Sequence, residues 1–148
     1  MNRPKESLRL RPVRESDLEA FYEDQRNPEA NQMAAFPARE HDAFMTHWHK
    51  LMADASVTLR AILYDGRVAG NVVSFMHGDT REVGYWIRRD QWGKGIATEA
   101  LRRFLRLDKA RPLYAGVVKH NIASIRVLEK CGFRMASEVG EEVILRLD

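Results

Sequence analysis

A glycine-rich turn stands between a β-type segment and an amphipathic helix, and it constrains this chain more than any other feature. The turn reads WGKG at residues 92–95 and follows the run EVGYWI at 82–87. Apolar residues then recur at helical spacing over 96–105. The first amide groups of a helix lack internal partners and carry partial positive charge, so a flexible turn there can wrap a phosphate. The sequence therefore predicts a pyrophosphate site at this helix start.

The individual residues of the turn suit that role. Gly93 and Gly95 allow the backbone to approach an anion closely, and Lys94 adds a cation. Ala97 is small enough to leave room for the ligand. An ordinary glycine-rich loop is the alternative interpretation of the same residues, since a glycine loop alone is a weak signal.

Two common phosphate loops do not fit these residues. A Walker loop needs Ser or Thr after Gly-Lys and a glycine five residues earlier, whereas Gly95 and Arg88 occupy those positions. A dinucleotide fingerprint needs a third glycine where Thr98 stands. The sequence thus gives no support to a P-loop NTPase and little to a Rossmann domain.

Strand and helix patterns alternate along the rest of the chain. Period-two alternation or β-forming composition predicts strands at 7–13, 57–64, 67–75, 82–87, 113–118 and 142–147. Helical spacing predicts helices at 16–27, 40–53, 95–105 and 121–131. The order β-α-α-β-β-β-α-β-α-β indicates a mixed α/β sheet with a strand–helix–strand crossover near its end. No repeat or linker divides residues 1–148, so we expect one domain.

Local signals place the boundaries of several elements. Ser16 and Glu19 form a capping-box pattern, and Asn27-Pro28 marks the end of that helix. Asp65-Gly66 suits the tight turn of an antiparallel hairpin. The dipeptide Phe36-Pro37 predicts a turn before the second helix.

Composition limits the function classes. The net charge of +3 comes from 24 basic and 21 acidic residues without a basic block, so we expect no nucleic-acid partner. No apolar run is long enough for a membrane span, and the N-terminus lacks a signal peptide, so we expect no membrane association. Cys131 is the only cysteine, which excludes an intramolecular disulfide. These features favour a cytoplasmic protein.

Two motifs together resemble the GNAT superfamily of N-acetyltransferases. WGKGIA at 92–97 resembles its acetyl-CoA pyrophosphate loop, although Trp92 replaces the usual Gln or Arg. NIASIRVLEKCGF at 121–133 is similar to the N-x-x-S-x-x-x-L-E-K-x-G-F segment of the ribosomal-protein N-terminal acetyltransferase branch (RimJ/RimL type). The opening LRLRPVRESDLEAFYE and the run EVGYWI fit that branch too. The resemblance therefore spans most of the chain and implies a GNAT-like, mostly antiparallel sheet.

The resemblance also implies acetyl-CoA as cosubstrate and assigns residues to it. The fourth and fifth strands of that family splay apart around the pantetheine arm, the turn binds the pyrophosphate, and the start of the last helix lies beside the thioester. For Asn121 a helix cap is the alternative role, and the two roles can coexist. The residues so assigned are Trp86, Ile87, Arg88, Trp92, Gly93, Lys94, Gly95, Ile96, Ala97, Thr98, Asn121, Ser124 and Arg126.

Two residues are candidates for catalysis. Attack on a thioester needs a neutral amine, so a carboxylate within reach can remove the ammonium proton. Glu82, at the start of the fourth strand, is the candidate base, and an ordinary rim glutamate is the alternative. Many GNAT members use a tyrosine in the last helix to assist the leaving thiolate, but Leu128 stands there. Ser124 is the replacement that the branch suggests.

The remaining reactive residues are interpreted as structural. Cys131 precedes Gly132 at a helix end without an obvious base, which favours a packing role over a nucleophile. No two histidines of helix 40–53 are three or four residues apart, so we expect no metal. Among the aromatic residues, Phe36 and Trp48 are candidates for contact with the substrate, and packing in the core is their alternative role.

The sequence therefore leads to two interpretations of function. The first is an acetyltransferase that moves an acetyl group directly from acetyl-CoA to a primary amine, either a peptide N-terminus or a small molecule. The alternative is a CoA-binding sensor or regulatory module without catalysis.

Overall fold

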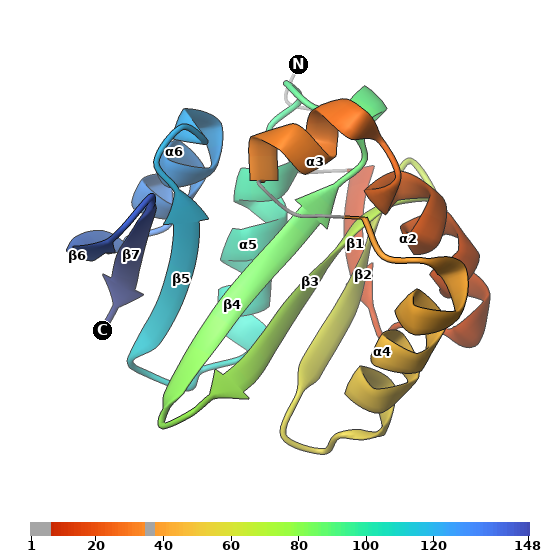
Figure 1. Ribbon diagram of the computed structural model, residues 1–148, viewed down its shortest axis with the longest axis horizontal. Helices are drawn as coiled ribbons and strands as arrows, with labels where there is room; N and C mark the ends of the chain where they lie inside the picture. Colours follow the sequence, from red (N-terminus) through yellow and green to blue (C-terminus); the bar gives the residue numbers. More distant parts are fainter. Residues whose placement is uncertain (1–6, 35–37) are drawn as a thin grey trace.

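A single mixed sheet organises the chain in the computed structural model, which describes residues 7–34 and 38–148. Within those residues the strand order is β1-β2-β3-β4-β5-β7-β6 (Figure 1). Neighbouring strands run antiparallel except for β4 and β5, which are parallel. The strands are β1 (Leu8–Arg11), β2 (Thr58–Tyr64), β3 (Arg67–His77), β4 (Thr80–Ile87), β5 (Leu113–Val118), β6 (Arg134–Val139) and β7 (Glu142–Leu147).

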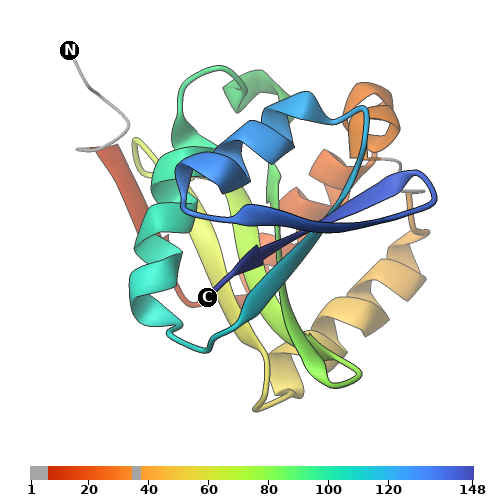
Figure 2. The same cartoon turned by 90° about the vertical axis from the view of Figure 1, so that its left-hand side faces the viewer.

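Helices cover both faces of this sheet. Helix α5 contacts β1 to β4 on one face, while α2 and α4 lie on the other, and Figure 2 shows the sheet between them. Helix α3 lies across the end of β4, and α6 follows β5 (Figure 1). The helices are α2 (Leu18–Gln25), α3 (Pro28–Ala34), α4 (His41–Ala53), α5 (Ile96–Leu107) and α6 (Ile122–Lys130), with 3-10 turns η1 (Glu15–Asp17) and η2 (Arg89–Gln91).

Strand alternation divides the core into two clusters. Adjacent strand residues point to opposite faces, so Ile62 packs toward α5 while Ala61 packs toward α2 and α4. Phe104 of α5 is fully buried in the first cluster, and truncating such a side chain to alanine costs about 3–5 kcal/mol. In the second cluster the rings of Phe21 and Trp48 lie 5.0 Å apart. The expected mixed α/β class with a mostly antiparallel sheet is confirmed.

Two local predictions are confirmed in detail. Asp65 and Gly66 both have positive φ, 53° and 79°, and join β2 to β3 in a tight antiparallel hairpin. Helix α5 connects the parallel strands β4 and β5, so a strand–helix–strand crossover is present, although it begins before the last third of the chain. The predicted Phe36-Pro37 turn lies outside the described residues.

The structure contains two elements that the sequence pattern did not predict. Helix α3 begins at Pro28, where the pattern was interpreted only as a helix end. Pro suits a first helical position, and the Asn27 side chain accepts a hydrogen bond from the Ala30 amide at 2.9 Å. Strand β6 is an edge strand whose six residues are all exposed, so it shows no apolar alternation.

The predicted capping box at Ser16 is wrong. Residues 15–17 form a 3-10 turn, and α2 begins only at Leu18. The buried Asp17 carboxylate accepts hydrogen bonds from the Arg14 amide at 2.8 Å and from the Arg11 guanidinium at 2.7 and 2.8 Å. The carboxylate of Asp17 therefore closes this turn, because a charged pair to Arg11 is available on β1 and Ser16 is exposed.

Candidate active site

The parallel strands β4 and β5 pair over only two positions. Arg81 lies opposite Leu113 and Glu82 opposite Tyr114, after which the strands diverge. Strand β4 stays paired with β3 up to Ile87, so the gap opens on its other edge (Figure 1). A cavity of about 460 Å³ occupies the opening, a size typical of small-molecule sites.

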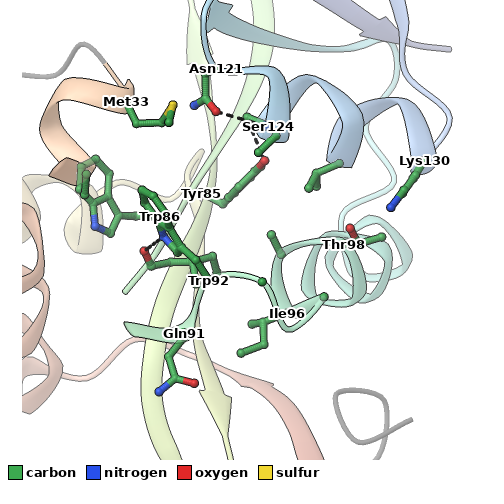
Figure 3. A pocket seen from close by; sticks show the side chains of 17 residues that line it. Met33, Tyr85, Trp86, Gln91, Trp92, Ile96, Thr98, Asn121, Ser124 and Lys130 are labelled. Atoms are coloured by element: carbon green, nitrogen blue, oxygen red, sulfur yellow. Dashed lines mark hydrogen bonds between the residues drawn. The ribbon is translucent and has the colours of Figure 1, made fainter. Parts of the chain in front are cut away.

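The cavity lining comes from four regions of the chain. Helix α3, the end of β4, the turn into α5 with its first residues, and one face of α6 all contribute (Figure 3). Ten of the thirteen predicted cofactor residues line it, whereas Arg88, Lys94 and Arg126 do not. The lining residues are Ala30, Met33, Tyr85, Trp86, Ile87, Gln91, Trp92, Gly93, Gly95, Ile96, Ala97, Thr98, Asn121, Ala123, Ser124, Val127 and Lys130.

One side of the cavity is the N-terminus of α5. Gly93 and Gly95 have φ of 82° and 76°, in the left-handed region that favours glycine. Gly95 is the N-cap residue of α5 and has no side chain that could accept a hydrogen bond from the helix amides. The Glu99 amide makes the first helical hydrogen bond, to the Gly95 carbonyl at 3.2 Å. The amides before Glu99 in the first turn therefore have no helical partner, which makes this end suited to an anion.

Cations surround this anion-binding end at different distances from the cavity. Lys130 of α6 lines it directly. The Lys94 ammonium instead donates to the Gln91 side chain at 3.1 Å and lies 5.5 Å above the Tyr64 ring. Arg126 is exposed on α6. Of the described cations, Lys130 is thus placed best to meet a bound phosphate.

Trp92 fixes the turn to the end of β4. Its indole Nε1 donates a hydrogen bond to the Ile87 carbonyl at 2.9 Å, and the Arg89 guanidinium lies 4.5 Å above its ring. These contacts give a physical reason for tryptophan at a position where the resemblance expects Gln or Arg. The residue positions the glycine turn through packing and one hydrogen bond.

The Arg88 side chain points toward α2 and not into the cavity. Its guanidinium pairs with Asp24 of α2 at 3.3 Å and with Asp90 at 3.4 Å, and its amide donates to the Ala69 carbonyl at 2.8 Å. Burial raises the pKa of Asp24 to about 6, against the lowering effect of Arg88. Arg88 thus ties α2 to the end of β4.

Two hydroxyl groups meet deep in the cavity. The Tyr85 Oη and Ser124 Oγ atoms lie 2.6 Å apart, and the Ser124 amide donates to the Asn121 side chain at 3.2 Å (Figure 3). Asn121 therefore caps α6 while it lines the cavity. Burial raises the pKa of Tyr85 to about 12, so the phenol stays protonated at neutral pH. The hydroxyl pair can donate one proton outward while it shares the other.

Sequence reasoning did not single out Tyr85. It lies within the run EVGYWI, and strand alternation places its side chain on the same face as the buried Val83 and Ile87. A polar hydroxyl on the apolar face of a strand next to the predicted splay was the available signal. The role of this hydroxyl is recognisable only in the folded structure, where α6 places Ser124 opposite Tyr85.

Glu82 lies outside the cavity. Its carboxylate contacts the His77 Nδ1 atom at 2.6 Å. Glu82, Gly84 and Trp86 share the face of β4 that turns toward α2 and α4, because Gly84 pairs with Val73 of that cluster. A Cβ added to Gly84 would meet nothing within 4 Å, so the surface between Glu82 and Trp86 is open. About 13 Å of strand separates these two residues, so proton transfer to Glu82 requires bridging water or an extended acceptor.

The other reactive residues take structural positions. The half-buried Cys131 thiol contacts the Thr98 carbonyl at 3.6 Å, and burial raises its pKa. Trp48 is buried beside Phe44 rather than facing a cavity. His41 and His49 pair with Glu19 and Glu15, each at 2.8 Å.

No group of three or more His, Cys, Asp or Glu side chains in residues 7–34 and 38–148 is placed to hold a metal ion. Over the same described ranges, no helix combines the length and the apolar character needed to cross a membrane.

The sheet is split between β4 and β5, and the start of α5 faces the opening. A family model described as "Acetyltransferase (GNAT) domain" matches residues 7–134, and the chain belongs to this family. A probable N-acetyltransferase of Bacillus subtilis, YjcK, is 41% identical over 77 residues. That match covers 47% of this chain and 42% of YjcK, so it spans less than half of either protein.

Solved structures share the fold at low sequence identity. Spermidine N-acetyltransferase of Vibrio cholerae, in complex with CoA and spermine, has a TM-score of 0.81 at 18% identity over 95% of this chain and 94% of that one. The ribosomal alpha-N-protein acetyltransferase RimL, in complex with coenzyme A, has a TM-score of 0.76 at 18% identity over 95% and 92%. At such identities the likeness concerns the fold alone.

Proposed function

We propose that this chain transfers an acetyl group directly from acetyl-CoA to a primary amine. The observation that carries the proposal is the opening between β4 and β5, which joins an anion-binding helix start to a largely apolar channel. A pyrophosphate linked to a flexible arm has the chemistry to fill both parts. The names of the two structural neighbours, which concern CoA and amine acceptors, agree with this proposal.

The residues of the cavity would bind the donor in a fixed direction. Amides of the turn and the first turn of α5 would receive the pyrophosphate, with Lys130 as the nearest cation. The arm would then run along the open edge of β4 beside Trp86. The thioester would lie near the hydroxyl pair of Tyr85 and Ser124, at the start of α6.

The transfer itself makes one C–N bond and breaks one C–S bond. A neutral amine attacks the thioester carbonyl, and the resulting intermediate expels the CoA thiolate. The amine arrives as an ammonium ion and must first lose a proton, for which Glu82 is the proposed acceptor through bridging water over Gly84. Its contact with His77, which is exposed, gives the proton a route to solvent.

The Tyr85 and Ser124 pair would assist the leaving group. Because their two oxygens share one proton at 2.6 Å, the second hydroxyl proton is available for a hydrogen bond to the developing thiolate. The nitrogen gives up its remaining extra proton as the amide forms, and the thiolate becomes a thiol, so protons balance. Cys131 has no part in this scheme.

We propose one donor, acetyl-CoA, but two classes of acceptor. A peptide N-terminus and a small-molecule amine both fit, and membership of the ribosomal-protein N-terminal acetyltransferase branch is a proposal that rests on the motif at 121–133. A cytoplasmic location also remains a prediction. The alternative function, a CoA-binding sensor without catalysis, needs the same cavity, and the presence of Glu82 and of the segment from Asn121 to Ser124 favours the enzyme.

Thioester consumption separates the enzyme from the sensor. The protein is incubated with acetyl-CoA and with panels of peptides with different N-termini, polyamines and aminoglycosides, and free thiol is measured. We expect release well above the no-amine control with at least one class and a mass gain of one acetyl group on that amine. Tight acetyl-CoA binding without release across all panels would favour the sensor.

A further inference from the structure

Helix α3 closes the side of the cavity opposite the anion-binding end. Figure 3 shows Met33 and Trp86 on one side of the pocket and Thr98 and Lys130 on the other. In an acyl-CoA the pyrophosphate, the pantetheine arm, the thioester and the acyl group follow one another in that order. A donor whose pyrophosphate sits at the start of α5 therefore carries its acyl group toward Met33.

Both sides of the opening hold α3 in place. On the side of β4, the Glu29 carboxylate of α3 pairs with the Arg89 guanidinium at 2.9 Å. On the side of β5, His120 Nε2 donates a hydrogen bond to the Gln32 carbonyl at 3.0 Å. The short helix thus bridges the two diverging strands, and its position above the cavity is defined by both of them.

The residues that α3 contributes to the cavity are apolar. Ala30 is only 3% exposed, so the helix backbone comes close to the cavity at that residue. Met33 is half-buried and lines the cavity from one helical turn further on. Trp86 of β4 completes this apolar end. No charged residue of the cavity lining belongs to α3, which suits an uncharged, short acyl group.

The geometry points to Met33 as the residue that limits the length of the acyl group. Its flexible side chain fills the space into which a chain longer than acetyl would grow. Displacing it costs packing, and each added methylene group changes discrimination in an apolar pocket by about tenfold or more. This inference rests on the proposed function, since it assumes an acyl-CoA in the cavity, and it adds the donor specificity of that site.

Binding of a thioester series tests the inference without knowledge of the acceptor. Affinities of CoA and of acetyl-, propionyl-, butyryl- and hexanoyl-CoA are measured by calorimetry for the wild type and for Met33→Ala. We expect wild-type affinity to fall about a hundredfold from acetyl to butyryl, which adds two methylene groups. In Met33→Ala the ratio of acetyl-CoA affinity to butyryl-CoA affinity should be at least tenfold smaller than in the wild type. The affinity of this variant for CoA itself should change less than about threefold.

Two further variants control for other effects of losing a methionine. Met33→Leu keeps most of the side-chain volume and should keep the wild-type dependence on chain length. Met135→Ala removes a methionine that is 49% exposed on β6 and should change no affinity.

The two ways in which the experiment can fail are distinct. If CoA binds normally but Met33→Ala keeps the wild-type dependence on chain length, the inference about Met33 is wrong and the proposed function stands. If neither protein binds CoA or any of its thioesters, the proposed function is wrong, and the inference with it.

Discussion

The side of the molecule proposed for the donor and the side proposed for the acceptor are built from different elements. On the proposed donor side, β4, α5, β5 and α6 follow one another along residues 80–130 and present helix amides, two glycines and larger side chains such as Trp86 and Lys130 to the cavity. On the proposed acceptor side, α2 and α4 meet the sheet through an aromatic cluster and through the ion pair of Asp24 with Arg88.

The difference concerns how much each side depends on particular side chains. A pyrophosphate can be received by amides at a helix start, which need only a turn of the right conformation and small neighbours. An amine acceptor needs side chains whose positions depend on packing between distant segments. Substitutions in the glycine turn should therefore affect every reaction equally. Substitutions on the face of β4 toward α2 and α4, and on these two helices, should affect stability, proton transfer or the choice of acceptor.

The largest effect is expected for Ala97→Glu on the donor side. The change places bulk and negative charge where the α5 amides face the proposed pyrophosphate, so acetyl-CoA affinity should fall more than about a hundredfold. Calorimetry measures the affinity, and circular dichroism checks that the fold persists. Ala136→Glu on the exposed strand β6 is the control and should bind normally. If Ala97→Glu binds acetyl-CoA with wild-type affinity, the pyrophosphate does not bind at the start of α5.

Glu82→Gln should reduce turnover with little change in acetyl-CoA affinity. General-base assistance contributes about a hundred- to ten-thousandfold, so turnover should fall at least tens of fold. The deficit should shrink as pH rises, because more of the amine arrives neutral. Rates across pH at saturating acetyl-CoA measure this, with the exposed Glu141→Gln as control. A deficit that stays constant with pH would leave Glu82 a role in substrate positioning only.

Tyr85→Phe and Ser124→Ala should each lower turnover by about tenfold, the worth of one hydrogen bond to the leaving group. If the two hydroxyls act as a pair, the double variant should lose little more than either single variant. Turnover of all four proteins with saturating acetyl-CoA gives this double-mutant cycle. Fully additive losses would show that the hydroxyls act separately.

The smallest effect is expected at Asp24. Burial raises its pKa to about 6 in the folded protein, above the ordinary value of 3.8. The folded state therefore binds more protons between pH 4 and 6, and stability falls as pH rises through that window. Asp24→Asn should remove this dependence and raise the free energy of unfolding at pH 7 by roughly 1 kcal/mol, with no gain at pH 4.

Urea unfolding at several pH values measures the stability of the Asp24 variant. Asp79→Asn, a substitution at an exposed turn residue, is the matched control and should keep the wild-type pH dependence. If the free energy of unfolding of Asp24→Asn changes with pH as steeply as that of the wild type, the buried carboxylate does not oppose folding. The contrast between the two sides would then lose this part of its support.

The same contrast explains what the sequence could predict. The glycine turn and the segment 121–133 are each continuous in the chain, so their resemblance to the family assigned eight of the ten predicted residues that line the cavity. The run EVGYWI supplied the other two, Trp86 and Ile87. Helix α3 was not found, because its role depends on ion pairs with Arg89 and a contact with His120, far away in the sequence. Strand β6 has no buried residue, and Arg88 turned out to serve α2.

Thermal unfolding with and without acetyl-CoA tests the central claim most directly, since the claim is that the opening between β4 and β5 binds this donor. A ligand bound only by the folded state adds about 2.7 kcal/mol at a hundredfold excess over its Kd. For a domain of this size that raises the Tm by roughly 5–10 °C. We expect this rise with acetyl-CoA and with CoA, and none with NAD or ATP. An unchanged Tm with saturating acetyl-CoA, together with a rise for NAD or ATP, would contradict the account.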